Sequence, residues 1–111
     1  MKLPERLRSL SILDAEITLP YPEVLEAIEI LRLENIGLLG WELILKGKDG
    51  RISHPTTVVG YSTSFEDDES YDDFVERSTW NSKTTIENFY KNEAENHSNI
   101  ELYFCITENE T

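Results

Sequence analysis

The sequence predicts an α+β fold, in which one small domain packs two main helices on one face of a small, mainly antiparallel sheet. Two segments carry apolar residues at helical spacing, and two others alternate apolar and polar residues as half-buried strands do. An Asp-Gly turn joins one of these strands to a return strand. The chain of 111 residues can form a core without disulfides or a metal, so we expect residues 1–111 to form a single domain.

The N-terminal segment, residues 1–19, has mixed periodicity. Leu3, Leu7 and Leu10 have helical spacing, whereas apolar residues alternate between positions 13 and 19. We therefore expect a short helix followed by a strand, and the sequence leaves the pairing of that strand open.

Residues 22–36 predict the first main helix. Pro22 suits a first helical position, and Gly37 is expected to end the helix in the left-handed conformation. The apolar residues of this segment repeat at helical spacing: Val24, Leu25, Ile28 and Leu31. Because Ile30 and Leu33 widen the apolar stripe, we expect this helix to be covered on more than one side.

Residues 39–46 alternate as a strand, with Trp41, Leu43 and Leu45 on one face. The tripeptide 48–50, Lys-Asp-Gly, predicts a tight hairpin turn into residues 51–52. Pro55 lacks a backbone donor and predicts an edge or a bulge before residues 57–61 continue the extended run.

The second main helix is expected from Ser70, as its cap, to about Glu93. Asp72 and Asp73 suit its first turn, where acids stabilise the helix dipole. A polar break at residues 96–99 precedes the clearest strand, residues 100–107. The predicted core combines both helices and both long strands: Ile28, Leu31, Leu43, Leu45, Ile86, Phe89, Leu102 and Phe104.

The chain is strongly acidic, with 22 Asp and Glu residues, 10 Lys and Arg residues and a net charge of −12. Such a field repels nucleic acid and anionic membranes and attracts cationic partners. The N-terminus leads into no apolar signal region, and no apolar run has the length of a membrane span. We expect a basic protein partner, no direct nucleic-acid or membrane contact and, with a single cysteine, a cytoplasmic location.

The acids at positions 66–69 precede the helix cap and have no evident local group to satisfy. We therefore expect them to contact a partner, although a solvated loop is an equal alternative. Trp80 falls away from the middle of the apolar stripe of its helix, so we expect an exposed indole that suits an interface anchor, although a wide or bent helix would bury it. The predicted partner-binding surface consists of seven residues: Glu66, Asp67, Asp68, Glu69, Tyr71, Glu76 and Trp80.

No motif predicts catalysis, a cofactor or a metal site. The acidic run lacks the alternation and the central glycine of an EF-hand loop. His54 and His97 are far apart and suit ordinary surface positions. Cys105 lies in an apolar strand with no base or helix terminus to lower its pKa, so we expect a buried, inert thiol.

Three function classes agree with these observations. The leading one is a non-catalytic acidic protein that occludes a basic partner, as immunity or inhibitor proteins block a toxin or nuclease. The second is an adaptor or non-catalytic subunit of a cytoplasmic complex, in which the acidity serves solubility. The third is a small enzyme with an unrecognised carboxylate site. The sequence leaves the identity of the partner and the oligomeric state open.

Overall fold

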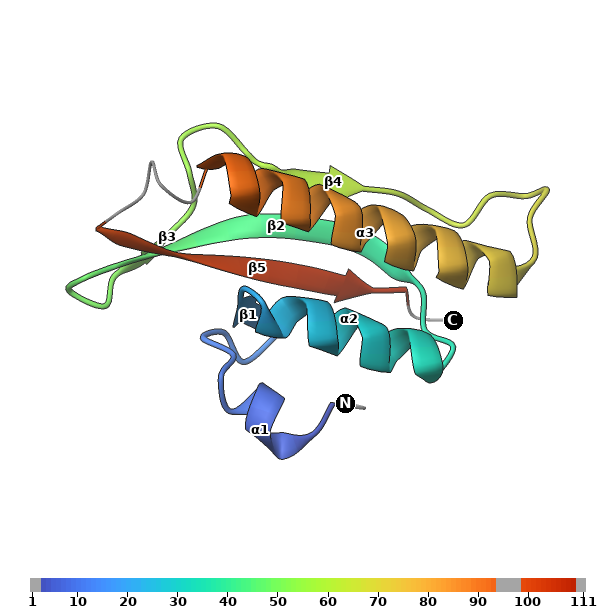
Figure 1. The fold of residues 1–111 in the computed structure, drawn as a ribbon, viewed down its shortest axis with the longest axis horizontal. Coiled ribbons are helices and arrows are strands. Elements are labelled where there is room, and N and C mark those ends of the chain that lie inside the picture. Colours follow the sequence, from blue (N-terminus) through green and yellow to red (C-terminus); the bar gives the residue numbers. More distant parts are fainter. Residues whose placement is uncertain (1–2, 94–98, 110–111) are drawn as a thin grey trace.

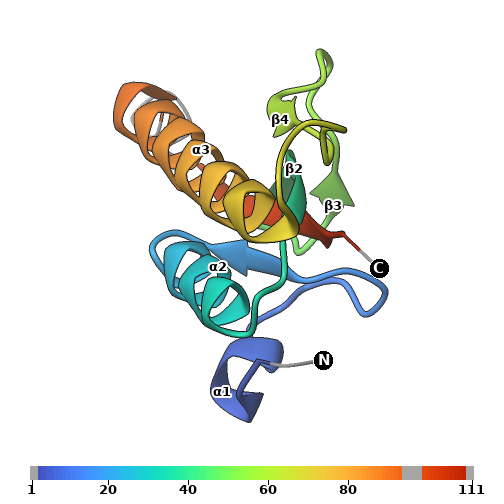
Figure 2. The same cartoon turned by 90° about the vertical axis from the view of Figure 1, so that its right-hand side faces the viewer.

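The computed structural model describes residues 3–93 and 99–109. Its helices are α1 (Glu5–Arg8), α2 (Glu23–Leu33) and α3 (Tyr71–Glu93), and its strands are β1 (Thr18–Pro20), β2 (Leu38–Gly47), β3 (Ile52–Ser53), β4 (Gly60–Ser62) and β5 (Ile100–Glu108). The main helices α2 and α3 lie on the same face of the sheet (Figures 1 and 2). The predicted α+β class is confirmed.

The sheet is antiparallel at every pairing of its described strands. Strand β5 lies between β1 and β2, and β2 also pairs with the two short strands β3 and β4. The register between β2 and β5 shifts between Leu38 and Gly40. Gly40 has φ +135°, and a Cβ atom there would lie 1.9 Å from the carbonyl oxygen of Tyr61 on β4. Only glycine fits where β4 joins the sheet at this irregularity.

The main core lies between the two helices and the sheet. Trp41, Leu43 and Phe104 contribute from the sheet, and the Trp41 and Phe104 rings meet edge to face with centroids 5.4 Å apart. The indole Nε1 of Trp41 donates a hydrogen bond of 2.8 Å to Thr85 Oγ1, which fixes α3 on β2. The predicted core is confirmed, although Leu45 and Phe89 are only partly buried at its margin.

A smaller apolar cluster lies on the opposite face of the sheet. It consists of Ile44, Tyr103 and Cys105, and the half-buried Ile12 packs against it. The segment between α1 and β1 therefore covers part of the face that the main helices leave open.

The N-terminal segment forms the expected helix and strand, α1 and β1. The strand is shorter than the alternation indicated, because only residues 18–20 pair with β5 and Ala15 is exposed. The expected hairpin turn is confirmed, with Gly50 at φ +83° and β3 returning along β2. Ser70 caps α3 as predicted, since its Oγ accepts the Asp73 N–H at 3.1 Å.

The predicted ends of α2 were wrong by one to three residues. Pro22 is the N-cap rather than the first helical residue, and the helix ends at Leu33. Asn35, at φ +59°, takes the left-handed conformation that Gly37 was expected to take. Gly37 is required for a different reason, because a Cβ atom there would lie 2.3 Å from Cε2 of the buried Phe74.

Candidate partner-binding surface

The acidic loop, residues 66–69, lies between β4 and the N-terminus of α3 (Figure 1). Arg77, from the second turn of α3, binds both flanks of this loop. Its Nη1 donates to Thr63 Oγ1 at 2.7 Å and its Nη2 to the Ser64 carbonyl oxygen at 2.8 Å. Its Nε and Nη2 donate to the two Glu69 carboxylate oxygens at 3.0 and 2.5 Å. One arginine thus fixes where the loop leaves β4 and where it enters α3.

Glu69 belongs to the internal structure of the loop. Its side chain is only 13% exposed, and its Oε1 also accepts the Glu66 N–H at 3.0 Å. The hydrogen bonds from Arg77 lower the pKa of the Glu69 carboxyl, and Glu69 in turn raises the pKa of Arg77. The expectation that none of the four acids satisfies a local group was therefore wrong for Glu69.

The other three acids of the loop face solvent. The side chains of Glu66, Asp67 and Asp68 are exposed, and none has a hydrogen-bond or ion-pair partner in residues 3–93 and 99–109. Phe65, next to them, stacks on Phe74 with ring centroids 5.5 Å apart. The loop thus presents three free carboxylates from a backbone that Arg77 and an aromatic contact hold in place.

Tyr71 and Glu76 each have an internal contact. The Tyr71 oxygen accepts the Gly37 N–H at 3.2 Å, and its ring packs edge to face on Phe65. Glu76 is exposed, and its Oε1 lies 3.1 Å from Nη1 of Arg32 on α2. Tyr71 therefore supports the start of α3, whereas Glu76 keeps a carboxylate at the surface between the helices.

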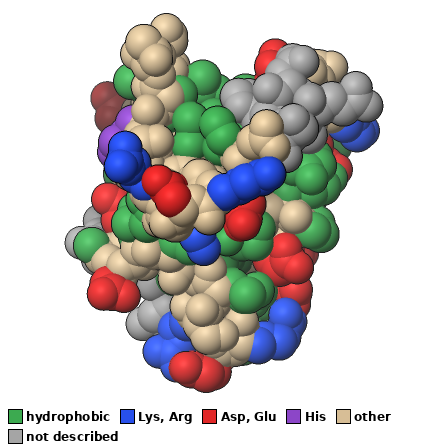
Figure 3. Space-filling view, turned by 90° about the vertical axis from the view of Figure 1, so that its left-hand side faces the viewer, with side chains coloured by type: hydrophobic (Ala, Val, Ile, Leu, Met, Phe, Trp, Pro, Cys, Tyr) green, Lys and Arg blue, Asp and Glu red, His purple; other side chains and the backbone are tan. Residues whose placement is uncertain are grey.

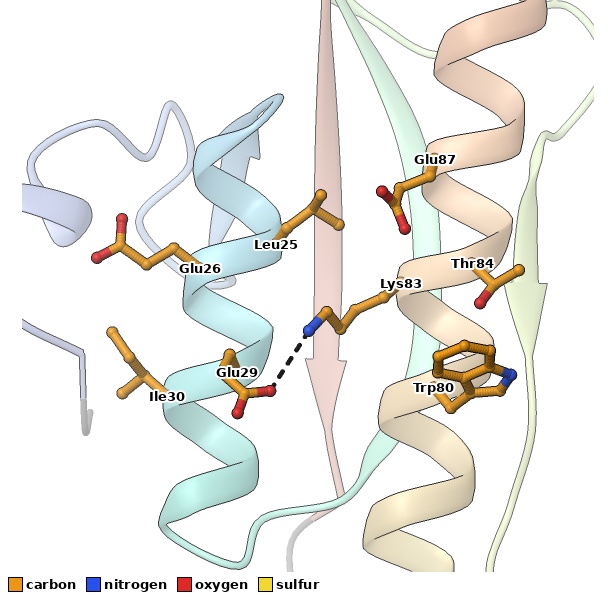
Figure 4. Close-up of a pocket in the computed structure, with 8 residues that line it drawn as sticks. All are labelled: Leu25, Glu26, Glu29, Ile30, Trp80, Lys83, Thr84 and Glu87. Atoms are coloured by element: carbon orange, nitrogen blue, oxygen red, sulfur yellow. Dashed lines mark hydrogen bonds and ion pairs between the residues drawn. The ribbon is translucent and has the colours of Figure 1, made fainter.

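Trp80 is 70% exposed, which confirms the exposed indole expected from the helical stripe. It lines a groove of about 570 Å³ between α2 and α3 (Figure 4). The remaining lining residues come from both helices: Leu25, Glu26, Glu29, Ile30, Lys83, Thr84 and Glu87. This α2–α3 groove could not be predicted from the sequence. The wide apolar stripe of residues 22–36 is the one sequence feature noted above that points to it.

An ion pair crosses the α2–α3 groove. Lys83 Nζ on α3 lies 3.4 Å from Glu29 Oε1 on α2, and Figure 4 shows Lys83 pointing to that carboxylate. Glu29 also accepts hydrogen bonds from Arg32, at 2.6 Å from Nη2. These contacts, the Arg32 bonds first, lower the pKa of Glu29. The Lys83–Glu29 pair thus ties α2 and α3 together across the groove.

Charge differs between the two ends of the molecule. Figure 3 shows the end that carries the β2–β3 hairpin, where Lys and Arg side chains lie among Asp and Glu side chains. The acidic loop lies at the other end of the long axis (Figure 1). The run of acids without an intervening base therefore occupies one end of the molecule.

Cys105 and the two histidines are the remaining candidate residues. Burial raises the pKa of the Cys105 thiol to about 11, and its Sγ donates to Glu16 Oε2 at 3.1 Å. His54 is exposed, with Nδ1 2.9 Å from Glu42 Oε2, and His97 lies outside the described residues. Within the described part of the chain, no three His, Cys, Asp or Glu side chains are grouped as metal ligands. No described helix is long and apolar enough to span a bilayer.

The family model of Immunity protein 40 matches residues 6–107, which include the acidic loop and both walls of the groove. The chain belongs to the Immunity protein 40 family. No curated protein and no solved structure matches it. Membership of the Immunity protein 40 family supports an immunity role and implies a protein partner such as a toxin. It favours a non-enzymatic protein over the small enzyme considered from sequence.

Proposed function

We propose that this chain neutralises a toxin with a basic surface by binding that surface and covering it. The observation that carries the proposal is the match of residues 6–107 to the Immunity protein 40 family. The net charge of −12 indicates that the partner surface is basic, because a strongly negative chain attracts cationic surfaces and repels acidic ones. The carboxylates would lie where a nuclease or a similar toxin binds phosphates.

In this proposal the acidic loop steers the approach of the toxin. Glu66, Asp67 and Asp68 are exposed and have no hydrogen-bond or ion-pair partner among the residues that the structure describes, so their charge is available to a cationic surface. Glu69 and Tyr71 contribute only indirectly, since their side chains form hydrogen bonds within the protein, Glu69 with Arg77 and Tyr71 with Gly37. A loop that is already ordered loses less conformational entropy on binding than a free one.

Glu76 and Trp80 continue the proposed surface along α3. They are four residues apart, which places them on one face of the helix. Aromatic residues with large exposed faces contribute much of the energy at protein interfaces. Glu76 and Trp80 would therefore add short-range contacts to the long-range attraction of the acidic loop.

We place the complex in the cytoplasm. The only cysteine is buried and hydrogen-bonded as a free thiol, which suits a reducing compartment.

Binding and protection together test the proposed function. The proposed function predicts that a toxin is encoded next to this chain; that toxin domain would be expressed alone and with the chain, and growth would be measured. The same domain, inactivated by substitution, would be titrated with the chain by calorimetry at two salt concentrations. We expect protection and a complex that weakens as salt rises. Protection without a complex, or a complex indifferent to salt, would contradict the proposal.

A further inference from the structure

The α2–α3 groove has an exposed indole on one wall. Trp80 is 70% exposed, whereas Trp41, the other tryptophan, is 5% exposed in the core. An exposed indole leaves a large apolar and polarisable face in water. Trp80 makes no ring stacking, cation–π contact or hydrogen bond within the described residues, so its face is open to a partner.

The free charge in the groove is negative. Four charged side chains line it, and three of them have partners in residues 3–93 and 99–109. Glu26 pairs with Arg6, and Glu29 pairs with Lys83. Glu87 has no hydrogen-bond or ion-pair partner within those residues, and Figure 4 shows its carboxylate pointing into the space between the helices. The groove therefore offers one aromatic face and one carboxylate that has no hydrogen-bond or ion-pair partner in the described part of the chain.

We propose that the α2–α3 groove binds a basic segment of the toxin, with an arginine stacked on Trp80 and a second basic side chain paired with Glu87. This inference rests on the proposed function and names the binding site and the partner's chemistry. A guanidinium suits the indole because it is planar and weakly hydrated, so it stacks on aromatic faces more readily than an ammonium does.

The two contacts set the spacing of that segment. Trp80 and Glu87 are seven residues apart on α3, about 10.5 Å along the helix axis. An extended segment spans that distance in about three residues. The half-buried Leu25 and Ile30 line the α2 side of the groove and suit the apolar stems of long basic side chains.

Dissociation rates test the inference, with the inactivated toxin domain as the probe. We expect Trp80→Ala to speed dissociation about tenfold or more, and Trp80→Phe to do so less because it keeps a ring. Glu87→Gln should speed dissociation several-fold at low salt and less at high salt. The matched control is Leu33→Ala, which removes another side chain that is 70% exposed but does not line the groove. That control should stay within about twofold of the wild type.

Acrylamide quenching of tryptophan fluorescence gives a second readout. Trp80 should be quenched in the free protein and protected in the complex, and Trp80→Phe, which leaves only the buried Trp41, should lose this change. Melting of each variant would verify that it is folded.

The outcomes separate this inference from the proposed function. If the wild type binds the toxin with salt dependence but Trp80→Ala dissociates at the wild-type rate, the groove is not the site and Trp80 is removed from the proposed surface, whereas neutralisation of a basic toxin through the acidic loop remains. If Trp80→Ala weakens binding but Glu87→Gln does not, the occupant is apolar and the basic segment is wrong. If the wild type fails to bind, the proposed function itself falls.

Discussion

Arg77 and Glu69 are joined by two hydrogen bonds, from Nε at 3.0 Å and from Nη2 at 2.5 Å, although they are eight residues apart in the chain. This pair divides the acidic loop by role. Glu69 fixes the backbone, and Glu66, Asp67 and Asp68 are left as exposed charges. We conclude that Glu69 keeps the acidic loop ordered, whereas Glu66, Asp67 and Asp68 supply its electrostatic field.

The first prediction concerns Glu69 and pH. Because Arg77 lowers the pKa of Glu69, the pair stabilises the fold above the ordinary glutamate pKa of about 4.3. That contribution should disappear as the pH falls through the lowered pKa, where the folded protein also takes up the proton. Urea unfolding of wild type and Glu69→Gln should therefore differ at pH 7 and converge in acid. A difference that stays constant from pH 7 down to acid would contradict the role of this ion pair.

The second prediction concerns two glycines with positive φ. Gly40→Ala should lower the free energy of unfolding by about 3 kcal/mol or more, because its Cβ would overlap the Tyr61 carbonyl oxygen and the backbone is strained. Gly50→Ala is the matched control, with φ +83° and no atom within 4 Å of the new Cβ. It should cost only about 1 kcal/mol for the backbone conformation. Equal losses in chemical denaturation would show that the β2–β4 contact is not as close as described.

The third prediction concerns the thiol of Cys105. With a pKa raised by burial to about 11, the thiolate is scarce at neutral pH, and the sulfur is also shielded. A disulfide reagent such as Ellman's should react slowly with the native protein at pH 8 and fully after addition of guanidinium. Rapid stoichiometric reaction of the native protein would contradict the buried position of Cys105.

Features set by neighbouring residues could be predicted from the sequence. The Ser70 cap, the turn at Gly50 and the exposure of Trp80 each depend on residues within a turn or two of one element. The left-handed residue after α2 was misplaced, because Gly37 is constrained by Phe74 on the other helix rather than by the helix end. Residue patterns along the sequence do not reveal contacts between segments that are far apart in the chain.

The candidate site could be predicted only in part for the same reason. The acidic loop and Trp80 are visible as residue types, but the structural role of Glu69 depends on Arg77 folding back onto the loop. Prediction of the α2–α3 groove also requires the relative positions of two helices, and β2, β3 and β4 separate these helices in the sequence. Glu87, whose carboxylate has no hydrogen-bond or ion-pair partner among the described residues, stands in no distinguishing sequence pattern.

The fourth prediction is that calcium does not stabilise this protein. The exposed acids of the loop are not grouped as ligands, since no described set of three His, Cys, Asp or Glu residues could hold a metal. Addition of Ca²⁺ or of a chelator should leave the melting temperature unchanged, because a ligand stabilises only where it binds the folded state. A saturable rise of the melting temperature with micromolar calcium would show that the acidic loop is a metal site.

The fifth prediction tests the steering role of the loop. We expect the triple variant Glu66→Gln, Asp67→Asn, Asp68→Asn to keep its stability, or to gain slightly as like charges are removed. A matched triple variant outside the loop, Asp14→Asn, Glu23→Gln, Glu34→Gln, removes the same number of charges. Melting curves of both variants would show that each is folded before any binding is compared.

The most direct measurement of the central claim is the association rate of the inactivated toxin domain with these proteins as a function of salt. The claim that exposed loop acids steer a basic toxin predicts that the loop variant associates about tenfold more slowly at low salt, with a flatter salt dependence. The matched variant should keep most of the wild-type rate and slope. A loop variant that associates as fast as the wild type, with the same salt dependence, would contradict the claim.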